Sequence, residues 1–282
     1  MNLSIIIPLS PNLNLDAHKD CNIPKEIEVI VVPGKNTSAN RNEGIKKANT
    51  ELVAFINGHT TLEGNWLEEV NNFFKEHPEI DIVGGPQLGW ERDNLFAQAS
   101  SLALGSKFGA AGASNRYGGK KLILDANETH IGSWNLICRK KVFERVLFDE
   151  TLYPGEDPKF ISDAQKSGFK MAFSPDIIVH NKKRGTALGL AKQIFGYGTA
   201  RPKKESLIQT MKHPTFLIPA LFVLYLPFFW LFKLPLGLYL LLGLIFSIYS
   251  AEDTKTFLCL LFIFPIIHIS YGVGFIWGVL NK

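Results

Sequence analysis

Two short groups of polar residues carry the side chains best suited to chemistry. Glu156 and Asp157 are adjacent carboxylates, and Asn57-Gly58-His59 follows directly on the apolar run Glu51–Ile56. A carboxylate held near a hydroxyl group and away from bulk water can take its proton, especially when a neighbouring acid raises its pKa. An imidazole can ligate a divalent cation, and ligands bind beyond the carboxyl ends of strands in open α/β sheets. The sequence therefore offers a candidate general base and a candidate ligand site.

Each group also has a purely structural explanation. Carboxylates beside Pro158 in a first helical turn complement the helix dipole, and Asn-Gly favours a simple turn. His180 ends the apolar run Ile177–Val179. It is either a ligand for a divalent cation or a hydrogen-bonded residue at a strand end. Residue types alone leave these alternatives open.

The elements that would position these residues alternate along the first 180 residues. Short β-branched runs ended by Pro or Gly predict buried strands, and capped segments predict helices. We expect strands at 3–8, 27–32, 51–56, 80–84, 133–139, 169–173 and 177–179, and helices at 38–49, 62–76, 141–146 and from about 155. This βαβ order predicts an α/β fold with a mostly parallel sheet. The region 85–127, rich in Gly, Ala and Ser, is expected to be a loop-and-helix insertion rather than a separate domain.

The last third of the chain is much more apolar. From Phe216 to Ser250 the only charged residue is Lys233, and Thr256–Leu280 has none. The second run has the length needed to cross about 30 Å of hydrocarbon. Pro235 interrupts the first run near its middle, which predicts two short spans or a kinked pair that only dips into the bilayer.

These patterns predict three regions. They are a first domain at 1–185, an amphipathic juxtamembrane segment at 186–213 and a membrane anchor at 214–282, whose two or three spans would lie at about 215–232, 235–251 and 256–280. The N-terminus begins a strand without the pattern of a secretory signal, so we expect the C-terminal spans to anchor the chain.

Basic residues cluster before the first apolar run. The cluster comprises Lys182, Lys183, Arg184, Lys192, Arg201, Lys203, Lys204 and Lys212. The positive-inside rule therefore predicts a multi-pass protein of the inner or cytoplasmic membrane whose first domain faces the cytoplasm. The net charge of +4 reflects this cluster, and without an interleaved aromatic and basic groove no nucleic acid is expected as a partner. Three cysteines without metal-type spacing fit a reduced compartment.

Five segments in a fixed order resemble family 2 glycosyltransferases of the GT-A fold, particularly the membrane-associated type of succinoglycan biosynthesis. They are IEVIVV, SANRNEGIKKAN, NGHTTLEGNWLEEV, GSWNLICRKKVFERV and GEDPKFISDAQKSGFKMAFSPDIIVHN, within the stretch from Leu3 to Lys212. The resemblance implies an inverting transferase. It would move a sugar from a nucleotide-sugar donor to a lipid-linked or growing saccharide acceptor in surface-polysaccharide synthesis.

The resemblance also implies residue roles. Asp157, next to Glu156, would be the catalytic base, and His180 would bind a metal or the diphosphate. Arg41, within Asn40-Arg41-Asn42-Glu43-Gly44, would contact the donor, or is a solvated helical residue. Trp134 and Asn135 lie where the acceptor wall is expected, although burial in the core explains a Trp equally well.

Two donor-side acids of the family pattern are missing. The chain reads Val32-Pro33-Gly34 where similar enzymes have a nucleotide-binding acid, and Asn57-Gly58-His59 where they have Asp-x-Asp. The Asp-x-Asp carboxylates hold the divalent cation that offsets the diphosphate charge, so their loss should weaken metal binding.

Three explanations for these missing acids remain open. His59, with the Asn57 carbonyl oxygen, ligates a Mn or Mg cofactor. Basic residues instead pair with the diphosphate, the candidates being Arg41, Arg139 and Lys182-Lys183-Arg184. In the third, the chain is a catalytically inactive binding or scaffold protein. A polyprenyl-phosphate sugar donor would also explain the missing nucleotide-binding acid.

Overall fold

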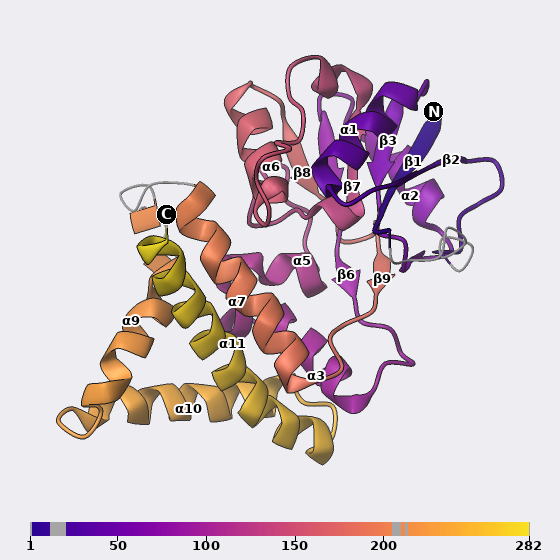
Figure 1. Cartoon of the computed structure of the whole chain (residues 1–282). Helices are drawn as coiled ribbons and strands as arrows, with labels where there is room; N and C mark the ends of the chain where they lie inside the picture. Colours follow the sequence, from indigo (N-terminus) through magenta and orange to yellow (C-terminus); the bar gives the residue numbers. More distant parts are fainter. Residues whose placement is uncertain (1, 12–20, 205–209, 212–213, 282) are drawn as a thin grey trace. The chain divides into compact units, whose positions relative to one another are not determined.

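The computed structural model describes residues 2–11, 21–204, 210–211 and 214–281 (Figure 1). Its contacts divide the chain into two compact units. The first comprises Met1–Leu88 and Asn115–Lys182, and the second comprises Gly89–Ser114 and Lys183–Lys282. The predicted domain boundaries at 185 and 213 stay a prediction, and the structure adds that Gly89–Ser114 packs with the C-terminal part.

The first unit is built on a six-stranded sheet with the order β2-β1-β3-β7-β5-β8. The strands are β1 (Leu3–Leu9), β2 (Glu28–Pro33), β3 (Leu52–Phe55), β5 (Ile82–Gly84), β7 (Leu136–Arg139) and β8 (Met171–Phe173). β1 runs parallel to β2 and β3, and β5 runs parallel to β8. β7 is antiparallel to both of its neighbours. The predicted α/β class with a mostly parallel sheet is confirmed.

Both faces of this sheet are buried, which is why its strands read as continuous apolar runs. Along β1, Ile5 and Ile7 join the core cluster that contains Trp66, whereas Ile6 joins the cluster on the other face. This alternation follows from the two-residue period of a strand. The second cluster also contains Phe148 and Phe160, whose rings stack with centroids 4.2 Å apart.

Helices and a small second sheet complete the first unit. The helical elements are α1 (Thr37–Lys47), α2 (Trp66–Glu76), α5 (Asn115–Gly118), η3 (Ser133–Asn135), η4 (Lys140–Glu144) and α6 (Glu156–Lys166). The second sheet has the order β4-β9-β6, formed by β4 (Thr60–Leu62), β9 (Val179–Asn181) and β6 (Gln87–Leu88).

Four predicted boundaries were wrong. Helix α2 begins at Trp66 rather than residue 62, because Thr60–Leu62 pairs with β9 instead. The strand predicted at 133–139 begins with the 3-10 turn η3, and the helix predicted at 141–146 is the 3-10 turn η4. The strand predicted at 177–179 is Val179–Asn181, shifted toward its partners β4 and β6.

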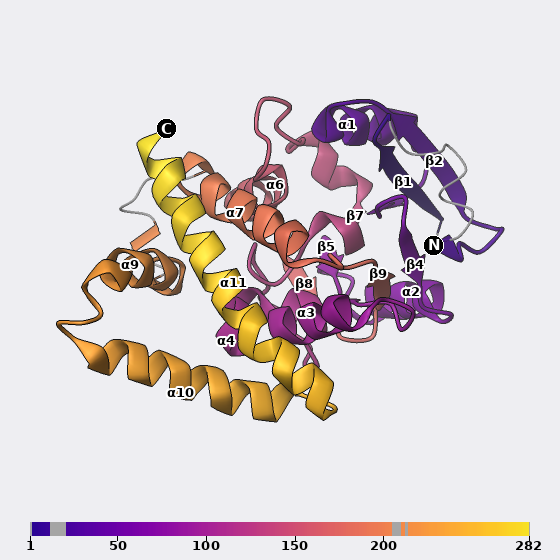
Figure 2. The ribbon, with the colours of Figure 1, turned by 60° about the horizontal axis from the view of Figure 1, so that its bottom comes forward.

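The second unit is helical. Its elements are α3 (Leu95–Gly105), α4 (Lys107–Ala110), η2 (Ala111–Ser114), α7 (Ala187–Lys204), η5 (Pro214–Phe216), α9 (Ile218–Tyr225), η6 (Leu226–Phe228), α10 (Lys233–Ser250) and α11 (Thr254–Leu280). α11 packs against α3, α7 and α9, and lies beside α7 in both views (Figures 1 and 2). Glycine permits the close approach of α7 and α11, because a Cβ atom on Gly274 would lie 2.2 Å from the Phe195 carbonyl oxygen.

Two helices of the described residues, α10 and α11, are long and apolar enough to cross a membrane. α10 carries exposed apolar side chains along its length, whereas α11 is partly covered by its neighbours. The predicted span at about 215–232 is instead divided between α9 and η6, where Pro227 stands at the break. Length and composition therefore indicate membrane association through α10 and α11.

Candidate active site

The site begins with helix α1, whose polar residues are buried. Asn36 caps the helix by accepting a hydrogen bond from the Ala39 amide at 3.1 Å. Asn40, Arg41 and Asn42 are all buried in the first turns. Buried polar groups need hydrogen-bond partners, and the side chains of all three residues donate to groups of the protein, although Nε of Arg41 has no partner among the described residues.

Arg41 joins three segments that are far apart in the sequence. Its Nη1 donates to Oδ1 of Asp157 at 2.8 Å and to Oε1 of Glu156 at 3.3 Å. Its Nη2 donates to Oγ of Ser133 at 2.7 Å. The guanidinium also lies over the Phe148 ring, 4.9 Å from its centroid. The structure thus brings predicted donor-site residue Arg41 together with predicted catalytic residues Glu156 and Asp157.

The two carboxylates open helix α6. Gly155 precedes them with φ of 115°, a left-handed conformation that favours glycine. Its amide donates to Oε2 of Glu156 at 3.1 Å. The positive end of the helix dipole stabilises negative charge in this first turn. Glu156 and Asp157 are 7% and 8% exposed, so both carboxylates are largely removed from water.

Burial changes the acidity of this pair. Loss of water around Glu156 and the negative charge of Asp157 together raise its pKa to about 7, against the opposing effect of Arg41. Near neutral pH a proton on Glu156 leaves one negative charge facing one guanidinium. The network can therefore hold a proton on Glu156 directly beside Asp157.

The loop before α6 is tied to α1 as well. Asn42 Nδ2 donates to the Phe148 carbonyl oxygen at 2.9 Å, and the Phe148 amide donates back to Asn42 Oδ1 at 3.0 Å. Asn36 Nδ2 donates to the Glu150 carbonyl oxygen at 2.7 Å. Roles for Ser133, Asn42 and Phe148 were not predicted from the sequence. The triplet Asn40-Arg41-Asn42 was a signal for Asn42 alone, because consecutive polar residues in a helix point in different directions and some of them face the core.

Trp134 and Asn135 lie side by side in η3 but have different surroundings. Asn135 is 1% exposed, accepts from Trp66 Nε1 at 3.2 Å, and donates to the carbonyl oxygens of Pro86 and Ile177 at 3.3 and 2.7 Å. Its amide therefore links four segments of the first unit. Trp134 is half-buried, with its indole against the backbone of Gly132.

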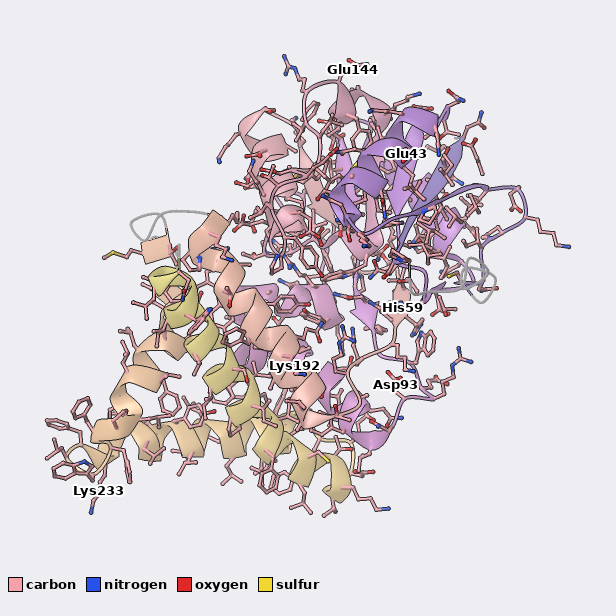
Figure 3. The ribbon with its side chains drawn as sticks, viewed as in Figure 1. Glu43, His59, Asp93, Glu144, Lys192 and Lys233 are labelled. Atoms are coloured by element: carbon pink, nitrogen blue, oxygen red, sulfur yellow. The ribbon has the colours of Figure 1, made fainter. Side chains whose placement is uncertain are left out.

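Asn57, His59 and His180 lie at the junction of the two sheets. Asn57 follows β3 and is half-buried, and its backbone N–H donates to Thr60 Oγ1 at 3.3 Å. His59 is exposed (Figure 3). β4 then pairs with β9, placing Thr61 opposite His180 and Thr60 opposite Asn181. Lys182 follows Asn181 and is exposed. Because Thr60 pairs with Asn181, Lys182 lies at the same end of β4 as His59.

His180 is already paired within the protein. Its Nε2 lies 2.6 Å from Oε2 of Glu63, a residue that the sequence analysis did not single out. Glu63 directly follows β4, and the antiparallel pairing of β4 with β9 makes this contact.

The residues at this strand end do not fit a metal site held by the protein. Among residues 2–11, 21–204, 210–211 and 214–281, no three His, Cys, Asp or Glu side chains are grouped closely enough to hold an ion. Mg²⁺ and Mn²⁺ favour carboxylate oxygens, whereas Asn57-Gly58-His59 supplies none.

One basic candidate for the diphosphate, Arg139, lies away from Asn57. Arg139 pairs with Leu52 at the beginning of β3, whereas Asn57 follows the other end of the same strand. Its guanidinium donates to the carbonyl oxygens of Phe74, Pro78 and Ile80. Arg139 is thus held at the opposite end of β3 from Asn57, and the suggestion that it binds diphosphate stays a prediction. Arg184 belongs to the second unit and is exposed there.

The fold and these contacts define an α/β protein with a carboxylate site at the start of a helix. The sequence profile described as "Glycosyltransferase like family 2" matches residues 17–195. That match covers more than half of the 282 residues, and the chain belongs to this family.

Individual relatives share only part of their length with this chain. It is 25% identical to the pre-mycofactocin glycosyltransferase of Mycobacterium tuberculosis, over 63% of this chain and 37% of that protein. It is 26% identical, over 57% and 49% respectively, to a Methanococcus voltae protein named dolichyl N-acetyl-alpha-D-glucosaminyl phosphate 3-beta-D-2,3-diacetamido-2,3-dideoxy-beta-D-glucuronosyltransferase. The chain thus spans less than half the length of these curated relatives.

A solved structure is also similar. It is S. aureus TarS residues 1–349 in complex with UDP-GlcNAc, with a TM-score of 0.46 and 12% identity over 100% of this chain and 93% of that one.

Proposed function

We propose that this chain is an inverting glycosyltransferase that moves a sugar from a nucleotide-sugar donor to a lipid-linked or growing saccharide acceptor in surface-glycan synthesis. The observation that carries the proposal is the buried carboxylate pair at the start of α6, fixed by Arg41. Membership of the glycosyltransferase family supports the reaction class.

Asp157 is the base in this proposal. Its Oδ1 accepts from Arg41, and Oδ2 makes no hydrogen bond to the described part of the chain. Oδ2 is therefore available to an acceptor hydroxyl. As the acceptor oxygen attacks the anomeric carbon, its proton passes to Asp157 and the bond to the nucleotide diphosphate breaks, which inverts the configuration.

The donor diphosphate requires positive charge at the end of β3. Arg41 is committed to Glu156 and Asp157, so we assign this role to His59 and Lys182, which the pairing of β4 with β9 brings to one end. A cationic side chain binds phosphate oxygens through charge-assisted hydrogen bonds. A divalent cation would here depend on the diphosphate and water for most of its ligands.

The acceptor side is assigned to Trp134. A half-buried indole gives a sugar or a lipid carrier a flat surface on which to pack. Asn135, in contrast, supports the site by holding its neighbours, because its amide is engaged on both sides. The Methanococcus voltae relative supports a lipid-linked acceptor, since its name gives a dolichyl-linked sugar phosphate.

Membrane association would hold the enzyme close to such an acceptor. α10 and α11 supply the apolar surface, and the basic residues from Lys182 to Lys212 favour a cytoplasmic location for the first unit. In this arrangement the protein is a multi-pass protein of the cytoplasmic membrane.

The proposal is tested by donor panels with the purified full chain. UDP- and GDP-sugars and a polyprenyl-phosphate sugar are each offered with Mg²⁺, Mn²⁺ or EDTA, and transfer or hydrolysis is followed. We expect turnover with a nucleotide sugar. Turnover only with the lipid donor would show that the donor is a polyprenyl-phosphate sugar and not a nucleotide sugar. No turnover by folded protein with any donor would favour a binding or scaffold protein.

A further inference from the structure

Gly89–Ser114 leaves the first unit after β6 and returns to it at α5, yet it packs with the C-terminal helices. Charged residues Glu91, Arg92 and Asp93 open the segment, and the stretch from Asn94 to Ser106 carries no charge. That stretch contains α3, which packs along α11. The composition and the contacts of this insertion both match those of the apolar helices.

Phe108, in α4, lies between the two candidate spans. Its ring centroid is 5.0 Å from that of Phe264 and 4.8 Å from that of His268, both on α11. On the α10 side, the corresponding distances are 5.6 Å to Tyr239 and 5.3 Å to Phe246. Four aromatic rings from two helices therefore surround one side chain of the insertion.

A hydrogen-bonded chain fixes the same contact. His268 Nε2 lies 2.8 Å from the Phe108 carbonyl oxygen, and because a carbonyl only accepts, Nε2 carries the hydrogen. Nδ1 of the same ring lies 3.0 Å from the Tyr239 hydroxyl oxygen. Polar groups and irregular backbone are tolerated at membrane depth only when such partners satisfy them.

The contact lies near the middle of α11. His268 is 14 residues after Thr254 and 12 before Leu280, the two ends of α11. On α10 (Lys233–Ser250), Tyr239 lies six residues after the first residue and Phe246 four residues before the last. If α10 and α11 enter the bilayer, the part of the insertion around Phe108 enters with them.

We propose that α3 and α4 form a re-entrant element that contacts lipid acyl chains beside α10 and α11, with Phe108 as its anchor. The inference rests on the proposed membrane association of α10 and α11. Lys107 is exposed, and its four-carbon stem allows the ammonium group to reach headgroups or water. The second unit would then contact the bilayer through this insertion as well as through its C-terminal helices.

Fluorescent labelling of the full chain in liposomes tests the inference. In a background without Cys21, Cys138 and Cys259, single cysteines replace Leu95 on α3, Leu241 on α10 and Lys47 on α1, all exposed positions, and each carries an environment-sensitive dye. Acyl-brominated lipids then quench the dyes within the acyl region. We expect quenching at Leu95 of at least half that at Leu241, and little at Lys47.

The outcomes separate two failures. If the label at Leu241 is quenched but the label at Leu95 is quenched no more than that at Lys47, the re-entrant element is contradicted. The membrane association of α10 would still hold. If the label at Leu241 is quenched no more than the label at Lys47, α10 does not enter the bilayer. That result would contradict both the membrane association and the re-entrant element.

A second pair of variants tests the anchor. F108A should reduce quenching of the Leu95 label while the Leu241 label stays quenched, which also reports that the helices remain inserted. F262A is the matched control, because Phe262 on α11 is 71% exposed. Equal quenching at Leu95 in F108A and F262A would show that Phe108 does not anchor the insertion.

Discussion

Arg41 donates a 2.8 Å hydrogen bond to Oδ1 of Asp157, a residue 116 positions further along the chain. The same guanidinium nitrogen contacts Glu156, so one buried cation serves both carboxylates. The family resemblance implied a donor contact for Arg41. The geometry adds that Arg41 fixes the orientation of Asp157, the base in our proposal.

Replacing the base should abolish transfer. For D157N we expect a loss of kcat of about 10²–10⁴-fold with the fold retained, since general base catalysis contributes on that order. Initial rates with the active donor measure it. D163N is the control, because Asp163 lies on the same helix and pairs with Lys159 instead. Wild-type activity in D157N would remove Asp157 from the mechanism.

Removing Arg41 should affect both stability and rate. R41Q leaves two buried carboxylates without their cation, and breaking a buried pair costs about 3–5 kcal/mol. R41K keeps the charge but loses the fork that also reaches Ser133, so we expect an intermediate effect. Thermal unfolding and initial rates are measured for both variants.

A double variant makes the Arg41 test specific. E156Q should offset part of the destabilisation caused by R41Q, because a neutral amide no longer needs the cation. R145Q, at an exposed arginine, is the control. Purely additive effects of R41Q and E156Q would contradict a shared charge network.

Glu156 should make stability depend on pH. Its pKa is about 7 in the folded chain and near 4.5 when unfolded, so its stabilising contribution is complete below pH 4.5 and is lost as pH rises through 7. The upper limit of this contribution is roughly 3 kcal/mol. In E156Q the dependence disappears, and the difference in melting temperature between pH 5 and pH 8 should shrink. E144Q, at an exposed glutamate, should keep the wild-type profile (Figure 3).

The kcat/KM for the donor should depend on His59 and Lys182. Loss of a hydrogen bond to a charged group costs about 1.5–3 kcal/mol, so H59A and K182A should each lower kcat/KM for the donor by roughly tenfold or more. K75A, at an exposed lysine of α2, is the control. We expect EDTA to leave more than half of the activity, and a tenfold loss that Mn²⁺ restores would contradict this assignment.

Asn135 should behave as a structural residue. N135A removes three buried hydrogen bonds and should destabilise the fold by about 2–4 kcal/mol while leaving the acceptor KM nearly unchanged. W134A should have the opposite effects: the stability of the fold should change little and the acceptor KM should rise. N65A, at an exposed asparagine of α2's cap, is the control for stability. An acceptor KM raised equally by N135A and W134A would restore a direct contact for Asn135.

Local sequence patterns predicted much of the fold but few of the side-chain contacts within the site. β1 and β3 were recognisable because strands buried on both faces read as unbroken apolar runs. β4 was missed because Thr60–Leu62 is short and polar, and only its partner β9 makes it a strand. Asp157 was predicted from the motif it shares with similar enzymes, whereas the Ser133 and Glu63 contacts have no local signal.

The sequence by itself determined the α/β order, the family, the position of the carboxylate pair at a helix start and the apolar C-terminal helices. Each of these depends on residues that are close in the chain, where periodicity and capping act. Tertiary structure alone decided that Arg41 holds Asp157, that Arg139 lies at the far end of β3, and that Phe108 packs with His268. These contacts join residues separated by many positions, so they follow from how the elements pack, which no local pattern encodes.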